Sequence, residues 1–175
     1  KAVELLKSTS REEVEKIADE INKNNEERKN LDKKATDEAK ALLVKYPNLS
    51  AKKTTVVYGK EWHKGVIGIV ASRLIEEYYK PTIVFTMSQN GFVTGSARSV
   101  HGFDLYDAIE SCADLLENFG GHLYAAGLTL KEENLPAFCE RIEKHISGKI
   151  IPEMQTPVVD VDAKLNFSQI TPKFL

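Results

Sequence analysis

Three short segments of this sequence combine glycine with side chains that bind anions. The first is Trp62–Gly68, in which His63 and Lys64 stand directly before a glycine. A helix is expected to begin there, and the free amides of a helix N-terminus favour an anion. Gly65 and Gly68 carry no Cβ, so a ligand or another backbone can approach closely. The alternative interpretation is ordinary packing of a helix on a sheet, with Lys64 in solvent.

The second segment is Gly95-Ser96-Ala97-Arg98-Ser99, at the end of a predicted strand. Ligands of α/β proteins are often bound at strand ends. A guanidinium with a hydroxyl on either side matches a phosphate, because Arg98 can bond two oxygens while Ser96 and Ser99 add short donors. The alternative is an ordinary strand end with a surface arginine.

The third segment, Gly120–Gly127, has the sequence Gly-Gly-His-Leu-Tyr-Ala-Ala-Gly and therefore very little side-chain bulk. We expect another group to pack against the backbone of Gly120 and Gly121. His122 lies inside this small-residue run, so we predict that it points at a ligand. The alternative is a structural histidine.

A metal site is not indicated by the histidines. His63, His101 and His122 lack a ligand spacing such as i, i+4, and no CxxC pair accompanies them. Catalytic triads, a Walker loop and a Rossmann fingerprint are also missing from the sequence. We therefore expect no catalytic residue and no bound metal or other cofactor in this sequence itself.

Two further groups of reactive side chains are given ordinary interpretations. Cys112 and Cys139 have no cationic or histidine neighbour in the sequence and are predicted to be buried free thiols. Five carboxylates recur along the stretch 104–117, and their spacing predicts a solvated outer face. These are Asp104, Asp107, Glu110, Asp114 and Glu117.

The segments lie within an alternation of strand and helix patterns. Strands are predicted at 54–58, 82–86 and 92–97, helices at 65–79, 105–116 and 131–146, and a Gly-rich approach to another strand at 119–130. Asn90-Gly91 predicts a hairpin turn, because both residues accept positive φ. The fold class is therefore α/β with a mixed sheet.

A long helix is predicted before this domain, from a capping box at Ser10–Glu13 to about Tyr46, where Pro47 follows. Its apolar stripe is interrupted in the middle, which favours a connector that packs at both ends. We expect three parts: 1–53 as the connector region, 54–150 as the main domain and 151–175 as a linker. A strand at 157–163 would open a further domain.

Composition and charge limit the choice of partners. Apolar residues make up 42% and the net charge is −2, which suits a soluble globular protein rather than a broadly basic nucleic-acid binder. Residues 54–175 carry 11 Lys and Arg against 15 Asp and Glu. No apolar run spans a bilayer and no leader is visible, so a cytoplasmic location without membrane contact is expected. The sequence opens at Lys1 in mid-pattern, which predicts a longer parent protein.

The three segments, in this order and at this spacing, resemble the DHH-associated domain of the RecJ exonuclease family. The resemblance covers the whole sequence: the long helix resembles the connector from a DHH catalytic domain, and the C-terminal stretch resembles the start of an OB-fold-like domain. It implies 5′-to-3′ degradation of single-stranded DNA in recombination and repair. Mn or Mg would be held by the DHH domain, whose Asp-His-His motif this sequence lacks.

The resemblance also implies roles for individual residues. Ser96, Arg98 and Ser99 would contact a terminal phosphate, and His122 with the backbone of Gly120 and Gly121 would lie near the scissile phosphate. His63 and Lys64 would belong to the same wall. Ala97 departs from the glycine found in many members of the family and restricts the backbone there.

Two alternatives remain open because Gly-Gly-His…Ala-Ala-Gly also occurs elsewhere. One is a nucleic-acid-binding module like that at the end of alanyl-tRNA synthetases. The other is a small-oligonucleotide phosphodiesterase of the DHH superfamily, which would need a metal site of its own. The His-Lys-Gly-Val-Ile-Gly block and the connector helix favour the RecJ family.

Overall fold

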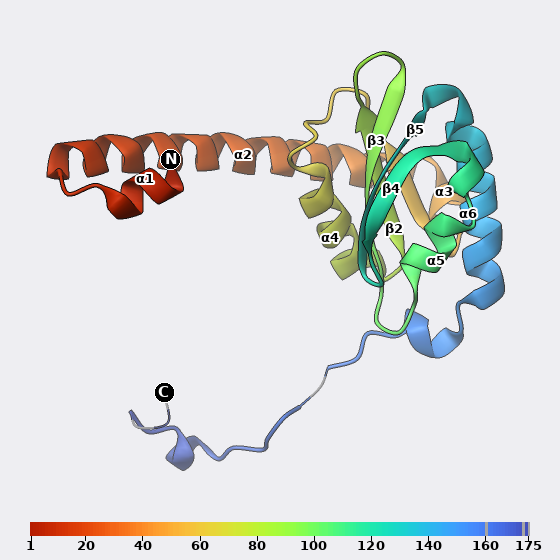
Figure 1. Cartoon of the computed structure of the whole chain (residues 1–175). Coiled ribbons are helices and arrows are strands. Elements are labelled where there is room, and N and C mark those ends of the chain that lie inside the picture. The colour runs from red at the N-terminus through yellow and green to blue at the C-terminus, as the bar shows by residue number, and fades with distance from the viewer. Residues whose placement is uncertain (160, 173, 175) are drawn as a thin grey trace.

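The computed structural model describes residues 1–159, 161–172 and 174. Its centre is one five-stranded sheet in the order β1-β2-β3-β5-β4 (Figure 1). The strands are β1 (Thr55–Tyr58), β2 (Thr82–Met87), β3 (Phe92–Arg98), β4 (Leu116–His122) and β5 (Ala125–Lys131). Only β1 and β2 are parallel, since a helix connects them, while the remaining neighbours are antiparallel. The predicted mixed α/β fold is confirmed.

Helices pack on both faces of this sheet (Figure 1). The α-helices are α1 (Ala2–Lys7), α2 (Arg11–Lys45), α3 (Pro47–Ser50), α4 (Ile67–Tyr78), α5 (Leu105–Glu110) and α6 (Leu135–Lys149). The C-terminal half of α2 and the apolar face of α4 bury one side, and α5 with α6 buries the other.

β2 is buried on both sides, which divides the interior into two cores. Val84 packs toward α4 and α2, whereas Ile83 and Phe85 pack toward α5 and α6. Phe85 meets Phe138 of α6 edge to face, with ring centroids 5.6 Å apart. On its side of the sheet α4 packs against β2 and β3, so the glycines of β5 and β4 there, Gly127 and Gly120, stay exposed.

The long helix is α2, which begins after Ser10 as predicted. The Ser10 hydroxyl accepts a hydrogen bond from the Glu13 amide. Its buried residues all lie between Asp32 and Leu43, and the preceding half is exposed apart from partial contacts near α1. The tightest contact at this boundary is buried Asp32, which accepts two hydrogen bonds from Arg73 of α4. The predicted long helix is confirmed, but it is buried only toward its C-terminal end and not at both ends, and α1 was not anticipated.

Several predicted boundaries were wrong. The stretch 119–130 is not a loop leading into one strand but the hairpin β4–β5, whose turn at Leu123-Tyr124 lacks the usual turn residues. The helix predicted at 105–116 ends at Glu110, and a short 3-10 turn follows at Ala113–Leu115. The last helix starts at Leu135, because the 3-10 turn Glu132–Asn134 precedes it.

The strand predicted at 157–163 is not formed by the described residues 157–159 and 161–163, and Asp160 lies outside the described residues. The stretch is highly exposed there, with Val159 84% and Val161 77% accessible, so no neighbouring strand satisfies its backbone. Among the described residues, no helix has the length and apolarity that crossing a membrane would require.

Four of the five carboxylates of 104–117 are exposed as predicted, Asp107 is partly buried, and three of the five also make specific contacts. Asp104 caps α5 by accepting from the Asp107 amide, and Asp114 pairs with Arg141. Asp107 accepts from Lys149 at 2.6 Å and lies 3.0 Å from His145. The hydrogen bonds with these two side chains lower the pKa of Asp107, the one with Lys149 more strongly than the one with His145. The group therefore ties α5 to α6.

Candidate functional site

Strand pairing aligns three rows of residues on the sheet face that α4 leaves open. Each row runs across β3, β5 and β4 in turn. The rows are Thr94–Thr129–Asn118, Ser96–Gly127–Gly120 and Arg98–Ala125–His122. We refer to them as the threonine row, the glycine row and the arginine row. The register thus brings the second and third predicted segments together on one surface.

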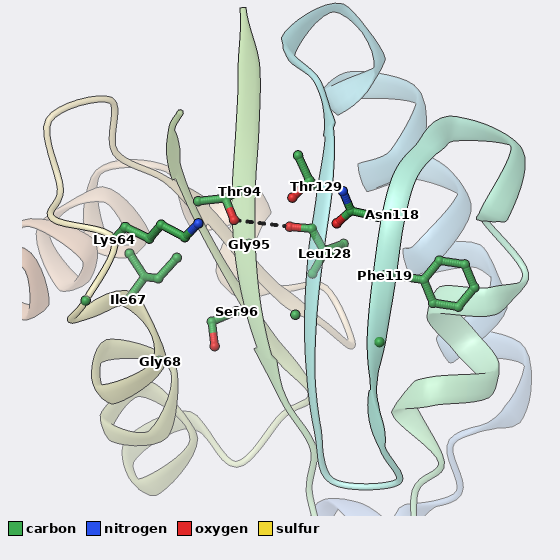
Figure 2. Close-up of a pocket in the computed structure, with 13 residues that line it drawn as sticks. Lys64, Ile67, Gly68, Thr94, Gly95, Ser96, Asn118, Phe119, Leu128 and Thr129 are labelled. Atoms are coloured by element: carbon green, nitrogen blue, oxygen red, sulfur yellow. Dashed lines mark hydrogen bonds between the residues drawn. The ribbon is translucent and has the colours of Figure 1, made fainter. Parts of the chain in front are cut away.

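The glycine row forms the floor of a cleft. Gly120 has no atom within 4 Å of where a Cβ would stand, and beside Gly127 the nearest atom is a carbonyl oxygen 4.0 Å away. The cleft has a volume of about 630 Å³, in the range of small-molecule sites. Figure 2 shows its lining, in which α4 forms one wall and β3, β5 and β4 form the base.

The N-terminus of α4 lies against β3 at this cleft. Val66 precedes the helix and gives no side-chain cap, so the first-turn amides are free of such a partner. A Cβ on Gly68 would stand 3.0 Å from both Nη2 of Arg98 and Oγ of Ser96. A side chain there would press on both groups, so glycine favours this approach, and the first predicted segment meets the second.

Arg98 is partly buried and has no acidic partner among the residues that the structure describes. Its Nη1 donates to the Ala97 carbonyl at 2.8 Å and to Ser96 Oγ at 3.2 Å. These neutral acceptors orient the guanidinium without neutralising it. An unneutralised cation beside an uncapped helix N-terminus is suited to an anion.

Ser99 is placed differently from Ser96. Its hydroxyl donates to the Phe103 carbonyl at 2.8 Å, and its amide donates to the Tyr124 carbonyl at 2.9 Å. The Ser99 proton is therefore already used within the chain. The geometry makes Ser99 a residue that holds the loop after β3, next to Arg98.

The two polar residues of the first segment separate in the structure. His63 Nδ1 accepts from the Gly65 amide at 3.0 Å, which shapes the turn before α4. Lys64 lines the cleft and makes no ion pair with any described residue. Figure 2 shows its amine extending toward β3. Of the two, Lys64 is the one positioned to meet a ligand.

The third segment places His122 at the exposed end of the arginine row. Two strand spacings, about 10 Å, separate the backbone of Arg98 from that of His122. Gly121 has a φ of 153°, and a Cβ there would lie 2.3 Å from the Ala125 carbonyl oxygen. Only glycine allows this hairpin to close, so Gly121 shapes the backbone while His122 remains accessible.

Sequence reasoning missed the threonine row. Thr94, Thr129 and Asn118 all line the cleft, yet each stands in a strand with no motif around it. The available signal was alternation, since Thr94 lies two residues before Ser96 on the same face of β3. Recognising the row required the β4–β5 pairing, including its register shift between Leu116 and Asn118.

No carboxylate of the described residues lines the cleft, although the chain is acidic overall. Among the described residues, no group of three His, Cys, Asp or Glu side chains is placed to hold a metal ion. The residues present here do not fit a divalent metal, and we derive no metal-dependent step from them. The cleft offers one lysine, hydroxyls, an amide and bare backbone, and Arg98 lies beside it, bonded to the lining residue Ser96. These groups suit a phosphate ester.

The DHHA1 domain family matches residues 51–148, which contain the whole sheet and the helices α4 and α5. The chain therefore belongs to the DHHA1 domain family. Within it, the predicted resemblance to RecJ is confirmed. The chain is 40% identical over 172 residues to the single-stranded-DNA-specific exonuclease RecJ of Bacillus subtilis, covering 97% of this chain and 22% of that protein.

Other relatives and solved structures agree. The RecJ exonuclease of Escherichia coli is 32% identical over 168 residues, covering 91% of this chain and 29% of that protein. The crystal structure of RecJ with Mn²⁺ from Thermus thermophilus superposes with a TM-score of 0.72 at 30% identity, covering 83% of this chain and 21% of that one. The chain thus spans less than a third of the length of these relatives.

Proposed function

We propose that this chain grips the 5′ end of single-stranded DNA for a RecJ-like 5′-to-3′ exonuclease. Hydrolysis of the phosphodiester belongs, in this proposal, to a DHH domain of the same longer protein, with Mn or Mg bound there. The chain alone is inactive and contributes binding and orientation of the strand. The RecJ relatives, whose names specify single-stranded DNA, support the substrate class.

One observation carries the proposal: Arg98 has no carboxylate partner in the described part of the chain and lies against the N-terminus of α4. A partly buried guanidinium without a counterion is unfavourable unless a ligand supplies the negative charge. Ser96 and the first turn of α4 add donors around the same point. A terminal phosphate provides the charge and the acceptor oxygens that this arrangement lacks.

The remaining contacts extend from that point. His122 and the exposed backbone of Gly120 lie on β4, at the ends of the arginine and glycine rows that are farthest from β3. They are proposed to contact the next phosphate, where the DHH domain would cut. Single strands are favoured because the sheet presents backbone and short side chains to sugar and phosphate, and no element enters a groove.

The test replaces Arg98 with Ala and measures binding of a 5′-phosphorylated oligonucleotide beside its 5′-hydroxyl counterpart. We expect the variant to bind the phosphorylated strand about 10- to 100-fold more weakly, because a charge-assisted pair is lost. Its affinity for the 5′-hydroxyl strand should be nearly unchanged. Arg141→Ala is the matched control, because it removes the same charge from an exposed pair with Asp114 on α6.

Equal losses for both strands would contradict the terminal-phosphate role of Arg98. A preference of the wild-type chain for a hairpin RNA over a single DNA strand would contradict the substrate class and favour a tRNA-binding module. Release of nucleotides by the chain with Mn²⁺ present would contradict its inactivity.

A further inference from the structure

The cleft continues beyond the glycine row, on the side away from Arg98. The proposed phosphate contacts do not use this part of the cleft. The polar groups of that part are Lys64 and the threonine row, Thr94, Thr129 and Asn118. Asn118 is exposed, and its amide makes no side-chain hydrogen bond to any described residue. Thr94 donates weakly to the Leu128 carbonyl at 3.4 Å (Figure 2). These groups are available to a ligand.

These groups lie close to the phosphate position. The Arg98 guanidinium bonds to Ser96 Oγ, and Ser96 is two residues, or about 7 Å along β3, from Thr94. The intervening floor is the glycine row, in which Gly127 and Gly120 present only backbone and Ser96 adds one short hydroxyl side chain. A sugar lying over that floor would place its base beside the threonine row.

The chemistry of this end suits a nucleoside better than a second phosphate. Among the described residues its one cation is Lys64, and its other polar groups are neutral. Hydroxyls and a primary amide can both donate and accept, as the edges of all four bases require. Buried Ile67 at the first position of α4 adds an apolar wall (Figure 2). The absence of carboxylates from the lining leaves nothing to repel a nucleotide.

We propose that Lys64 and the threonine row form a nucleoside subsite for the sugar and base of the terminal nucleotide, whose phosphate lies at Arg98. This inference rests on the proposed function and extends it in one direction along β3. The subsite accepts any of the four bases, because its donors and acceptors can rotate or exchange roles.

The experiment compares two probes by NMR of the ¹⁵N-labelled chain, which detects weak binding and reports folding in the same spectrum. Inorganic phosphate should shift the amides around Arg98, Ser96 and Gly68. Thymidine 5′-monophosphate should shift these and also the amides of the threonine row. A nucleotide footprint no larger than that of phosphate would overturn the subsite and leave the proposed phosphate grip intact. Absence of any shift near Arg98 with either probe would overturn both.

A substitution gives an independent readout. Asn118→Ala should lower the affinity for thymidine 5′-monophosphate about 5-fold, because one neutral hydrogen bond is lost. It should leave the affinity for inorganic phosphate unchanged. Asn30→Ala is the control, because it makes the same change on the exposed surface of α2. Equal affinity of wild type and Asn118→Ala for the nucleotide would contradict the role of Asn118.

Discussion

Arg98 differs from the other arginines in what surrounds it. Of the five arginines in the sequence, Arg11, Arg73 and Arg141 pair with carboxylates, and Arg28 is exposed and bonds to a neighbouring asparagine. Among the described residues, Arg98 is the one partly buried arginine that is held by neutral acceptors alone. In the sequence, all five arginines have ordinary polar neighbours. Only their contacts in the folded chain distinguish a structural arginine from one that could bind a ligand.

The two cysteines, predicted to be buried free thiols, allow a test of burial at the residue scale. Cys112 is fully buried and Cys139 is half-buried, and burial raises the pKa of both thiols, that of Cys139 to about 11. A raised pKa lowers the fraction of reactive thiolate at pH 8, by about 100-fold for Cys139 relative to a free thiol. We expect alkylation of the native chain at pH 8 to be slower than in denaturant by at least that factor. Rapid alkylation of the native chain would show an open thiol site.

At the scale of elements, α2 is coupled to the loop that carries Lys64. Trp62 is 8% exposed, and its indole lies on Gly59, where a Cβ would be only 2.1 Å from the ring. Its Nε1 donates to Glu38 of α2 at 2.7 Å, while its carbonyl accepts from Thr86 of β2 at 2.6 Å. The helix and the sheet together therefore fix the turn that leads to Lys64.

Removing the Glu38 acceptor should loosen this turn. Glu38→Ala leaves the Trp62 indole N–H without its partner, which costs about 1–3 kcal/mol of stability. Because Trp62 is the only tryptophan, its fluorescence reports on the turn directly, and we expect emission shifted to longer wavelength. Binding of thymidine 5′-monophosphate should weaken as well.

Glu38→Gln is the matched variant, because it keeps an acceptor oxygen and removes only the charge. It should restore most of the emission and the binding. Unchanged fluorescence in Glu38→Ala would mean that the turn is held by β2 alone.

At the scale of the whole molecule, the charge at the cleft differs from the negative net charge of the chain. Residues 54–175 are acidic, but no carboxylate lines the cleft, and the acidic groups of α5 and α6 lie on the other side of the sheet. Affinity for a strand must therefore come from a few cations. Long-range attraction of the strand by the chain should be weak.

Salt dependence measures this directly. With Arg98 at the terminal phosphate and Lys64 at the nucleoside, the logarithm of the binding constant for a single strand should fall with the logarithm of salt concentration at a slope of about −0.7. Titrations at four salt concentrations give the slope. A slope near −4 or steeper would mean that a broad basic surface, and not this cleft, binds the strand.

The sequence by itself determined the three segments, the alternation of strands and helices and the long helix, because these depend on local patterns. Glycine placement, the 3.6-residue period of α2 and the Asn90-Gly91 turn are all properties of neighbouring residues. Both residues of that turn do adopt positive φ. The family resemblance rested on the same local motifs and was confirmed over most of the chain.

Tertiary structure alone decided which residues share a surface. The threonine row depends on pairing between strands far apart in sequence, and a shift of one residue would turn Asn118 to the opposite face. The approach of Gly68 to Arg98 likewise depends on how α4 packs on β3. Such contacts follow from strand register and helix packing, which local sequence patterns do not encode. They also explain why Lys64 reaches the cleft while the neighbouring His63 does not.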